Sequence, residues 1–267
     1  MGLEFTNYEI EGKIGDGAFG PVYSGTRKQD GHRVAIRVMP EGLVDSRRAK
    51  DRFSREMRKV ATLHHVTLCR LLEFGEVQGQ LAVIMEYMEG TPLSRLLGSP
   101  PQAMPHTRAI QIVREVLKGM NYVHGKGLIH GDISPGNIFV GQQGDIKIAD
   151  LGVAGGLSFG TASSPHLPAR LLCYMAPEYL LEGVVDARTD VYSIGMVLYK
   201  TLVGPMPLAL DEITEQDVMR VVLRKPLPPA REVNPQVPAW LQEVLTEALS
   251  HDPSRRLRSC EAFLNRL

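Results

Sequence analysis

The sequence His-Gly-Asp-Ile-Ser-Pro-Gly-Asn occupies residues 130–137, and Asp-Leu-Gly follows at residues 150–152. Both motifs lie within residues 125–178, where Gly, Asp, Ser and Pro are frequent and loops are predicted. Loops held by a rigid frame often carry the functional side chains of a protein. The acids and the asparagine also have plain structural interpretations, as turn formers, caps or loop acids. Motifs elsewhere in the chain decide between these interpretations.

The first third of the chain has the pattern of a small sheet. Residues 8–39 read as short strands, and residues 68–75 and 81–87 read as two more. Residues 45–63 carry apolar side chains at helical spacing among Arg and Lys. We therefore expect an antiparallel sheet with one helix packed on it.

The rest of the chain has helical periodicity. Apolar stripes run through residues 113–123, 191–202 and 240–248, as expected for buried faces of helices. The sequence Glu-Gly-Thr-Pro at residues 89–92 separates the two patterns. We therefore divide the chain into an N-terminal lobe, residues 1–89, and a C-terminal lobe, residues 90–267.

Residues 15–22 read Gly-Asp-Gly-Ala-Phe-Gly-Pro-Val and fit the pattern G-x-G-x-x-G-x-V. Glycine lets the backbone approach a polyphosphate without an intervening side chain. The motif alone is weak, because ordinary hairpin turns contain the same glycines. A dinucleotide-binding fold needs these glycines to open a helix, whereas residues 21–24 continue as a strand. The context favours a glycine-rich flap between two strands.

Further motifs follow in the order found in the protein kinase family, which the chain resembles from about residue 8 to its last residue. Residues 34–37, Val-Ala-Ile-Arg, are similar to the V-A-I-K strand, and Glu56 lies in the helix where the family carries a partner glutamate. Residues 130–137 resemble H-R-D-L-K-P-x-N, and residues 150–152 resemble D-F-G. The resemblance implies an α+β fold of two lobes. The smaller lobe would be an antiparallel sheet with one main helix, and the larger would be mostly helical.

The C-terminal lobe adds three more matches. Residues 176–178 read Ala-Pro-Glu, and residues 190–195 fit the central helix of the large lobe. The family pairs the glutamate of the first motif, here Glu178, with an arginine that corresponds to Arg256. The details look most like a bacterial-type Ser/Thr protein kinase.

The resemblance implies a cleft that binds ATP together with Mg²⁺. Val22 and Ala35 would cover the adenine from one side and Phe139 from the other, while the backbone of Glu86 and Met88 would bind its edge. The implied ATP-binding residues are Gly15, Gly17, Gly20, Val22, Ala35, the gatekeeper Met85, Glu86, Met88 and Phe139.

Phosphoryl transfer depends mainly on positioning and on charge neutralisation. The resemblance implies that Asp132 accepts or orients the proton of the attacking hydroxyl. Asn137 and Asp150 would supply the hard oxygen ligands that Mg²⁺ prefers. The remaining implied catalytic positions are Arg37, Glu56 and Ser134.

The chain departs from the family pattern at four positions. Arg37 replaces the strand lysine, and its planar fork cannot reproduce the lysine's point contact. Ser134 replaces the catalytic-loop lysine, which removes a cation near the transferred group. Leu171 replaces a small hydroxyl residue, and Gly131 replaces the arginine before the catalytic aspartate. We therefore expect reduced catalysis, and we expect that phosphorylation of Ser158, Thr161, Ser163 or Ser164 is not the main activation switch.

Three functions remain open at this point. The first is a Ser/Thr protein kinase with attenuated or atypical catalysis. The second is a pseudokinase, a nucleotide-binding or scaffolding module that signals through a partner. The third is a small-molecule phosphotransferase, because such enzymes share a glycine before the catalytic aspartate.

Composition limits the partners. Lys plus Arg and Asp plus Glu number 30 each in 267 residues, so no global charge draws the chain to nucleic acid. No signal peptide or long apolar run is visible, and we expect no membrane contact from this segment. The three cysteines are far apart and have no metal-site spacing, which favours a cytoplasmic location. The expected partners are ATP and a protein substrate or signalling partner.

Overall fold

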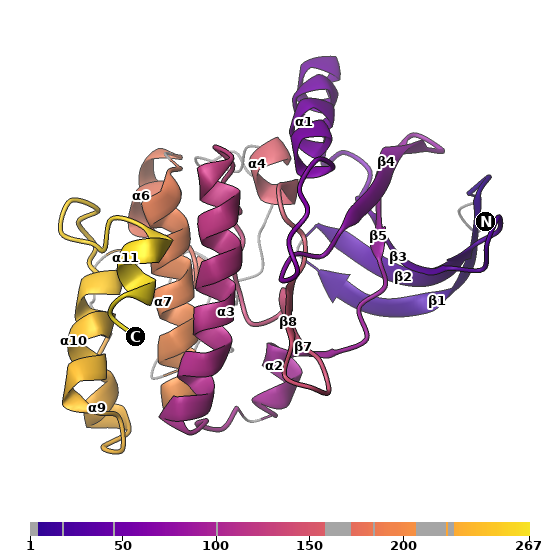
Figure 1. Ribbon diagram of the computed structural model, residues 1–267. Helices are drawn as coiled ribbons and strands as arrows, with labels where there is room; N and C mark the ends of the chain where they lie inside the picture. Colours follow the sequence, from indigo (N-terminus) through magenta and orange to yellow (C-terminus); the bar gives the residue numbers. More distant parts are fainter. Residues whose placement is uncertain are drawn as a thin grey trace.

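The computed structural model describes residues 5–17, 19–44, 46–99, 101–157, 172–183, 185–206, 223 and 227–267. Five strands form one antiparallel sheet in the order β1-β2-β3-β5-β4. Their bounds are Tyr8–Gly17 (β1), Gly20–Arg27 (β2), Arg33–Val38 (β3), Leu71–Val77 (β4) and Gln80–Glu86 (β5). Figure 1 shows this sheet at one end of the molecule and a group of helices at the other. The predicted α+β fold is confirmed.

Strand β3 is buried on both faces and carries a charge on one of them. Val34, Ile36 and Val38 belong to a small apolar cluster on one face, whereas Ala35 belongs to the large core on the other. Side chains alternate along a strand, so Arg37 shares the face of Ala35. The register of β3 therefore directs an arginine toward the C-terminal lobe.

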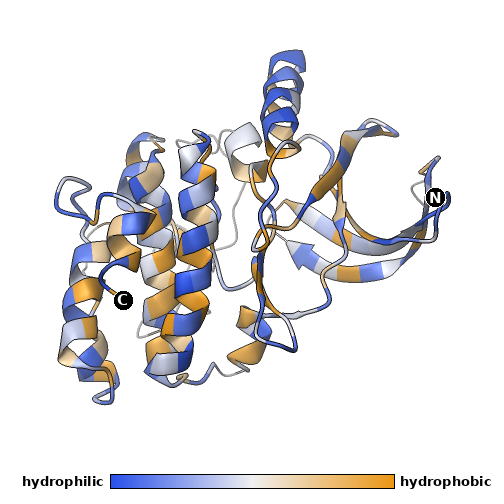
Figure 2. Ribbon diagram, in the orientation of Figure 1, coloured by the Kyte–Doolittle hydropathy of each residue, from blue (hydrophilic) through white to orange (hydrophobic). Residues whose placement is uncertain are grey.

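Helix α1 (Arg47–Val60) forms where helical periodicity predicts it. The Ser46 side chain accepts a hydrogen bond from the Ala49 amide and caps the first turn. Phe53, Met57 and Val60 are buried at i, i+4 and i+7. The opposite face is charged and appears blue in Figure 2. One apolar stripe therefore fixes α1 against the sheet and α4 (Val153–Leu157).

Helix α7 (Ala187–Val203) is the centre of the C-terminal lobe, because it is buried almost throughout. An Asp186–Thr189 capping box defines its first turn. Helices α3, α9, α10 and α11 pack against α7. The bounds of the remaining helices are Leu93–Leu96 (α2), His106–Gly125 (α3), Pro177–Glu182 (α6), Ala230–Val233 (α9), Ala239–Ala248 (α10) and Cys260–Leu264 (α11).

A second, three-stranded sheet lies between the large sheet and these helices. It contains β6 (Thr91–Pro92), β7 (Ile138–Val140) and β8 (Ile146–Ile148), in that order. The sequence pattern predicts a loop-rich segment at residues 125–178 and does not identify the strands β7 and β8 and the helix α4 within it. Three-residue strands are too short to produce a periodic pattern. In the described residues, no helix is both long and apolar enough to cross a membrane.

Candidate active site

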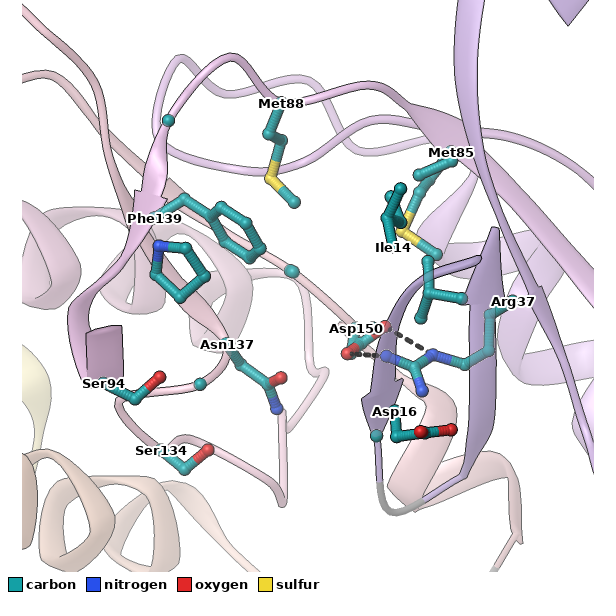
Figure 3. Close-up of a pocket in the computed structure, with 18 of the residues that line it drawn as sticks. Ile14, Asp16, Arg37, Met85, Met88, Ser94, Ser134, Asn137, Phe139 and Asp150 are labelled. Carbon is teal, nitrogen blue, oxygen red and sulfur yellow. Dashed lines mark hydrogen bonds and ion pairs between the residues drawn. The ribbon is translucent and has the colours of Figure 1, made fainter. Parts of the chain in front are cut away.

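A cavity of about 530 Å³ separates the five-stranded sheet from the small sheet. Figure 3 shows side chains from the N-terminal lobe and from the C-terminal lobe pointing into this cavity. Most of the residues predicted to bind ATP line it: Gly15, Gly17, Val22, Ala35, Met85, Met88 and Phe139. Asp132, Ser134, Asn137 and Asp150 line it as well. The structure thus brings residues separated by more than a hundred positions into one site.

One end of the cavity is an apolar slot. Phe139 faces Ile14 and Met85 across it, and Met88 lies at its edge (Figure 3). Apolar walls on two sides suit a flat heterocycle. Ile14 was not predicted from the sequence, although it directly precedes the glycine motif and is 46% exposed. The sequence signal that could have found it is the position of an apolar residue directly before the glycine motif.

The segment that follows β5 crosses the edge of this slot. Glu86 does not line the main cavity; its amide donates to the Arg70 carbonyl at 3.0 Å, and its side chain pairs with Lys147 at 2.6 Å. The Met88 backbone has no hydrogen-bond partner among the described residues. Unpaired backbone groups beside a cavity are available to a ligand. Met88 therefore fits its predicted role better than the Glu86 amide does.

Arg37 and Asp150 form a buried ion pair inside the cavity (Figure 3). The Arg37 Nε donates to Asp150 Oδ1 at 2.9 Å, and Nη2 donates to Oδ2 at 2.5 Å. Nη1 donates to the Gly20 carbonyl at 2.9 Å, which explains why Gly20 touches the site without lining the cavity. Only 5% of the Arg37 side chain and 4% of the Asp150 side chain are exposed. A bidentate pair of this kind is strong and geometrically specific.

Asp150 also has an unusual backbone. Its φ of 62° lies in the left-handed region, which costs a residue with a side chain about 1–3 kcal/mol at such sites. The two hydrogen bonds from Arg37 help to hold the carboxylate in this conformation. The Arg37–Asp150 pair therefore fixes the backbone of the cavity wall at Asp150 and also the position of the Asp150 negative charge.

Glu56 does not occupy its predicted position beside Arg37. Its carboxylate pairs with Lys59 on the same helix at 3.1 Å, while Arg37 takes Asp150 instead. The guanidinium fork matches the two oxygens of Asp150, which lies on the same side of the cavity. Glu56 is therefore outside the cluster of site residues, and the contact that the family's lysine makes with this glutamate has no counterpart at Arg37.

Asp132 and Asn137 form a compact polar pair on the opposite wall. The Asn137 Nδ2 donates to Asp132 Oδ2 and to the Asp132 carbonyl, both at 2.8 Å. Burial raises the Asp132 pKa from 3.8 to about 7, and the nearby negative charge of Asp150 raises it further. Ser134 is buried beside them. Position 134 consequently brings no positive charge to the site.

Hydrogen bonds to His130 and Asp190 hold the loop that carries Asp132. His130 Nδ1 accepts from the Asp132 amide at 3.2 Å, so its Nε2 carries the proton and donates to the Ala149 carbonyl at 2.9 Å. Burial lowers the His130 pKa, which keeps the ring neutral. Asp190 on α7 accepts from the amides of His130 and Gly131, both at 2.9 Å. The loop that carries Asp132 is therefore anchored to the central helix α7.

A second chain of contacts reaches Asp190 from the C-terminal helix. His124 Nε2 lies 2.8 Å from Asp190 Oδ2, and the other ring nitrogen of His124 lies 3.6 Å from the Sγ of Cys260 on α11. Both Cys260 and Asp190 are fully buried. Three side chains thus connect α11 to the loop that carries Asp132.

The predicted Glu178–Arg256 pair is present. The Arg256 Nη1 and Nη2 donate to the two Glu178 carboxylate oxygens at 2.7 and 2.9 Å. The Arg256 side chain is 0% exposed and lies over the Tyr192 ring, 5.0 Å from its centroid. This ion pair fastens α6 to the loop before α11. Leu171 and the hydroxyls at residues 158–164 lie outside the described residues.

The donor set for a divalent ion is small. Among the described residues, no group of three His, Cys, Asp or Glu side chains could hold a metal ion. Asn137 and Asp150 offer the oxygen ligands that Mg²⁺ prefers, and Mg²⁺ often takes one or two protein oxygens together with substrate phosphates. The residues therefore fit such an ion in type. Both Asp150 oxygens, however, already accept hydrogen bonds from Arg37.

A glycine-rich strand above a cleft and an anchored Asp-Asn loop below it define a protein kinase. The chain belongs to this family, because the model of the protein kinase domain matches residues 8–266. ATP and divalent metal use are general properties of the family. The family assignment also disfavours the small-molecule phosphotransferase considered from the sequence.

The similar proteins are bacterial kinases. The chain is 30% identical to serine/threonine-protein kinase Pkn1 of Myxococcus xanthus, over 100% of this chain and 38% of that protein. It is 30% identical to PknL of Mycobacterium tuberculosis, over 94% of this chain and 62% of that protein. The crystal structure of the Mycobacterium tuberculosis PknI kinase domain aligns with a TM-score of 0.77 at 26% identity, over 99% of this chain and 96% of that one. The chain spans less than two thirds of the curated relatives' length.

Proposed function

We propose that this domain transfers the γ-phosphoryl group of ATP to a serine or threonine hydroxyl of a protein. The observation that carries this proposal is the position of Asp132, whose carboxylate is held by Asn137 at 2.8 Å within the same cavity as the glycine-rich strand. The names of the curated relatives support the Ser/Thr assignment.

The chemistry assigned to each residue follows from its position. Asp132 takes the proton of the acceptor hydroxyl as that oxygen bonds to the γ-phosphorus, and the bond to the ADP oxygen breaks. A pKa of about 7 leaves Asp132 partly ionised at neutral pH, which suits a group that must accept a proton. Asn137 orients Asp132, and the slot around Phe139 holds the adenine. A Mg²⁺ ion held by Asn137 and Asp150 would neutralise charge on the phosphates.

We further propose that catalysis is slow. The pair between Arg37 and Asp150 leaves Asp150 committed to a protein cation, and Ser134 supplies no cation to the transferred group. Transfer depends steeply on geometry, and about 1 Å of misplacement can cost on the order of a hundredfold in rate.

A second candidate is a nucleotide-binding signalling module without transfer. The same Arg37–Asp150 pair favours it, because Asp150 is the carboxylate that would otherwise bind the metal. The cysteines Cys69, Cys173 and Cys260 are buried and none of them is in a disulfide, which is compatible with a reducing compartment, and we propose a cytoplasmic location for either function.

The deciding experiment measures phosphate incorporation from ATP into a generic protein acceptor. We expect slow incorporation that falls at least about a hundredfold in Asp132→Asn, because the proton acceptor is lost. Asp51→Asn, a change at an exposed position on α1, should leave the rate unchanged. A nucleotide-induced rise in melting temperature without any incorporation would instead establish the signalling module.

A further inference from the structure

The Arg37 guanidinium lies directly beneath the glycine-rich strand. A Cβ on Gly17 would be 2.2 Å from Nη1, and Nη1 also donates to the carbonyl of Gly20. The polyphosphate of a nucleotide held under these glycines would therefore meet this guanidinium. The contact explains in physical terms why position 17 has no side chain.

Arg37 also keeps unused hydrogen-bonding capacity. A guanidinium has five N–H groups, and the bonds to Asp150 and Gly20 use three of them. The other two have no partner in the described part of the chain. Arg37 lines the cavity, so these groups can donate to phosphate oxygens.

The charges around the cavity favour a contact between Arg37 and the phosphates of a nucleotide. The charged residues that line it in the described structure are Asp16, Arg37, Arg95, Asp132 and Asp150. Arg95 follows Ser94 on α2, which lies across the cavity from Arg37 in Figure 3. Arg37 is therefore the cation at the Asp150 end, where it cancels a carboxylate that would otherwise repel phosphate.

A divalent ion at Asp150 conflicts with this arrangement. It would need the two oxygens that now accept hydrogen bonds at 2.9 and 2.5 Å, and it would stand next to the guanidinium charge. Two cations this close in a buried site repel each other strongly. The ion can bind at Asp150 only at the expense of the Arg37 pair.

From these contacts we propose that Arg37 takes over the phosphate-neutralising role of the metal ion in nucleotide binding, so that ATP binds without a divalent cation. The inference rests on the proposed nucleotide site but not on transfer, which retains its own requirement for an ion. Arg37 is thus a binding residue for the metal-free nucleotide, and the replacement of the family's lysine by Arg37 in this chain alters the ligand that the cleft accepts.

The test is calorimetric titration of ATP into the purified domain, once in EDTA and once with saturating MgCl₂. We expect the two dissociation constants of the wild type to agree within about fivefold. In Arg37→Lys, a single ammonium cannot hold both Asp150 oxygens, so binding should become at least about tenfold tighter with Mg²⁺ than in EDTA. Arg108→Lys makes the same change on α3, away from the cavity, and should behave like the wild type.

A second variant covers the case in which Arg37→Lys fails to fold. Asp150→Asn removes the charge that Arg37 cancels, so ATP should bind at least as tightly as to the wild type both in EDTA and in MgCl₂. A site that needs Asp150 as a metal ligand would instead bind ATP more weakly than the wild type in MgCl₂. Wild-type binding that tightens more than about fivefold with Mg²⁺ would overturn the inference and leave the proposed function standing. Absence of ATP binding in both conditions would overturn the proposed function as well.

Discussion

The protonation state of Asp132 affects the stability of the fold as well as the proposed reaction. Its pKa in the folded protein is about 7, against an ordinary 3.8, and burial is the main cause. A carboxyl group with a raised pKa stabilises the fold fully only below its ordinary pKa. That contribution is then lost as the pH rises through about 7. Burial of Asp132 therefore destabilises the fold in the pH range in which its carboxylate is ionised and able to accept a proton.

This predicts that Asp132→Asn stabilises the protein at alkaline pH. An amide has no charge to bury, and its oxygen can still accept from Asn137. The variant should gain up to about 4 kcal/mol over the wild type at pH 8, since each pKa unit is worth about 1.36 kcal/mol. The advantage should disappear near pH 4. Urea unfolding of the nucleotide-free protein at both pH values measures it, and a difference that does not change with pH would contradict it.

Residue identity predicted which side chains gather at the site, but not how they pair. The motifs named Arg37, Asp132, Asn137 and Asp150, and all four line the cavity. Glu56 corresponds to the family's partner glutamate, but the carboxylate that pairs with Arg37 is that of Asp150. The three-dimensional geometry of the site determines which of the carboxylates within reach a long side chain pairs with. The sequence alone does not give that geometry.

At the scale of elements, the glycine-rich strand and β3 are fitted to each other. A Cβ at Gly17 would collide with Arg37, whereas a Cβ at Gly15 would have nothing within 4 Å. Gly15 and Gly17 belong to one motif, but the absence of a side chain has a different structural effect at each position. Gly17 makes room inside the protein, while Gly15 leaves room for a ligand.

Gly17→Ala should consequently destabilise the nucleotide-free domain by about 1–3 kcal/mol, because Arg37 must move away from its buried partner. Gly15→Ala is the matched variant and should stay within about 0.5 kcal/mol of the wild type. Chemical denaturation without nucleotide compares them. Equal stabilities of the two variants would show that Arg37 adapts without loss.

The elements themselves were predictable to different degrees. Helix α1 was visible because its buried residues recur at helical spacing, and strand β3 was visible because it is a short run of buried, mostly β-branched residues. Strands β7 and β8, each three residues long, and the glycine-containing α4 were not. These short elements are stabilised by the two lobes around them, and that context is absent from a local window of sequence.

At the scale of the whole molecule, the contribution of an ion pair to stability depends on its burial. Glu178 and Arg256 join α6 to the loop before α11, with side chains 13% and 0% exposed. Glu247 and Arg266 form a pair of similar length, 2.7 Å, with side chains about 40% exposed. Removing one partner of a buried pair leaves an uncompensated charge, whereas water screens the exposed pair.

We expect Glu178→Gln to cost about 3–5 kcal/mol of unfolding free energy. Glu247→Gln, the matched change at the exposed pair, should cost less than about 1 kcal/mol. Both values come from denaturation curves at neutral pH. A loss of similar size in the two variants would mean that burial does not set the strength of these pairs.

The contact between Cys260, His124 and Asp190 has a practical consequence. Because Asp190 positions the loop of Asp132, a shortened gene product that stops before Cys260 would lose its C-terminal helix and also a support of the reactive centre. A shorter domain that is expressed without α11 would therefore have a lower activity than the longer one. That low activity would be mistaken for an intrinsic property of the enzyme.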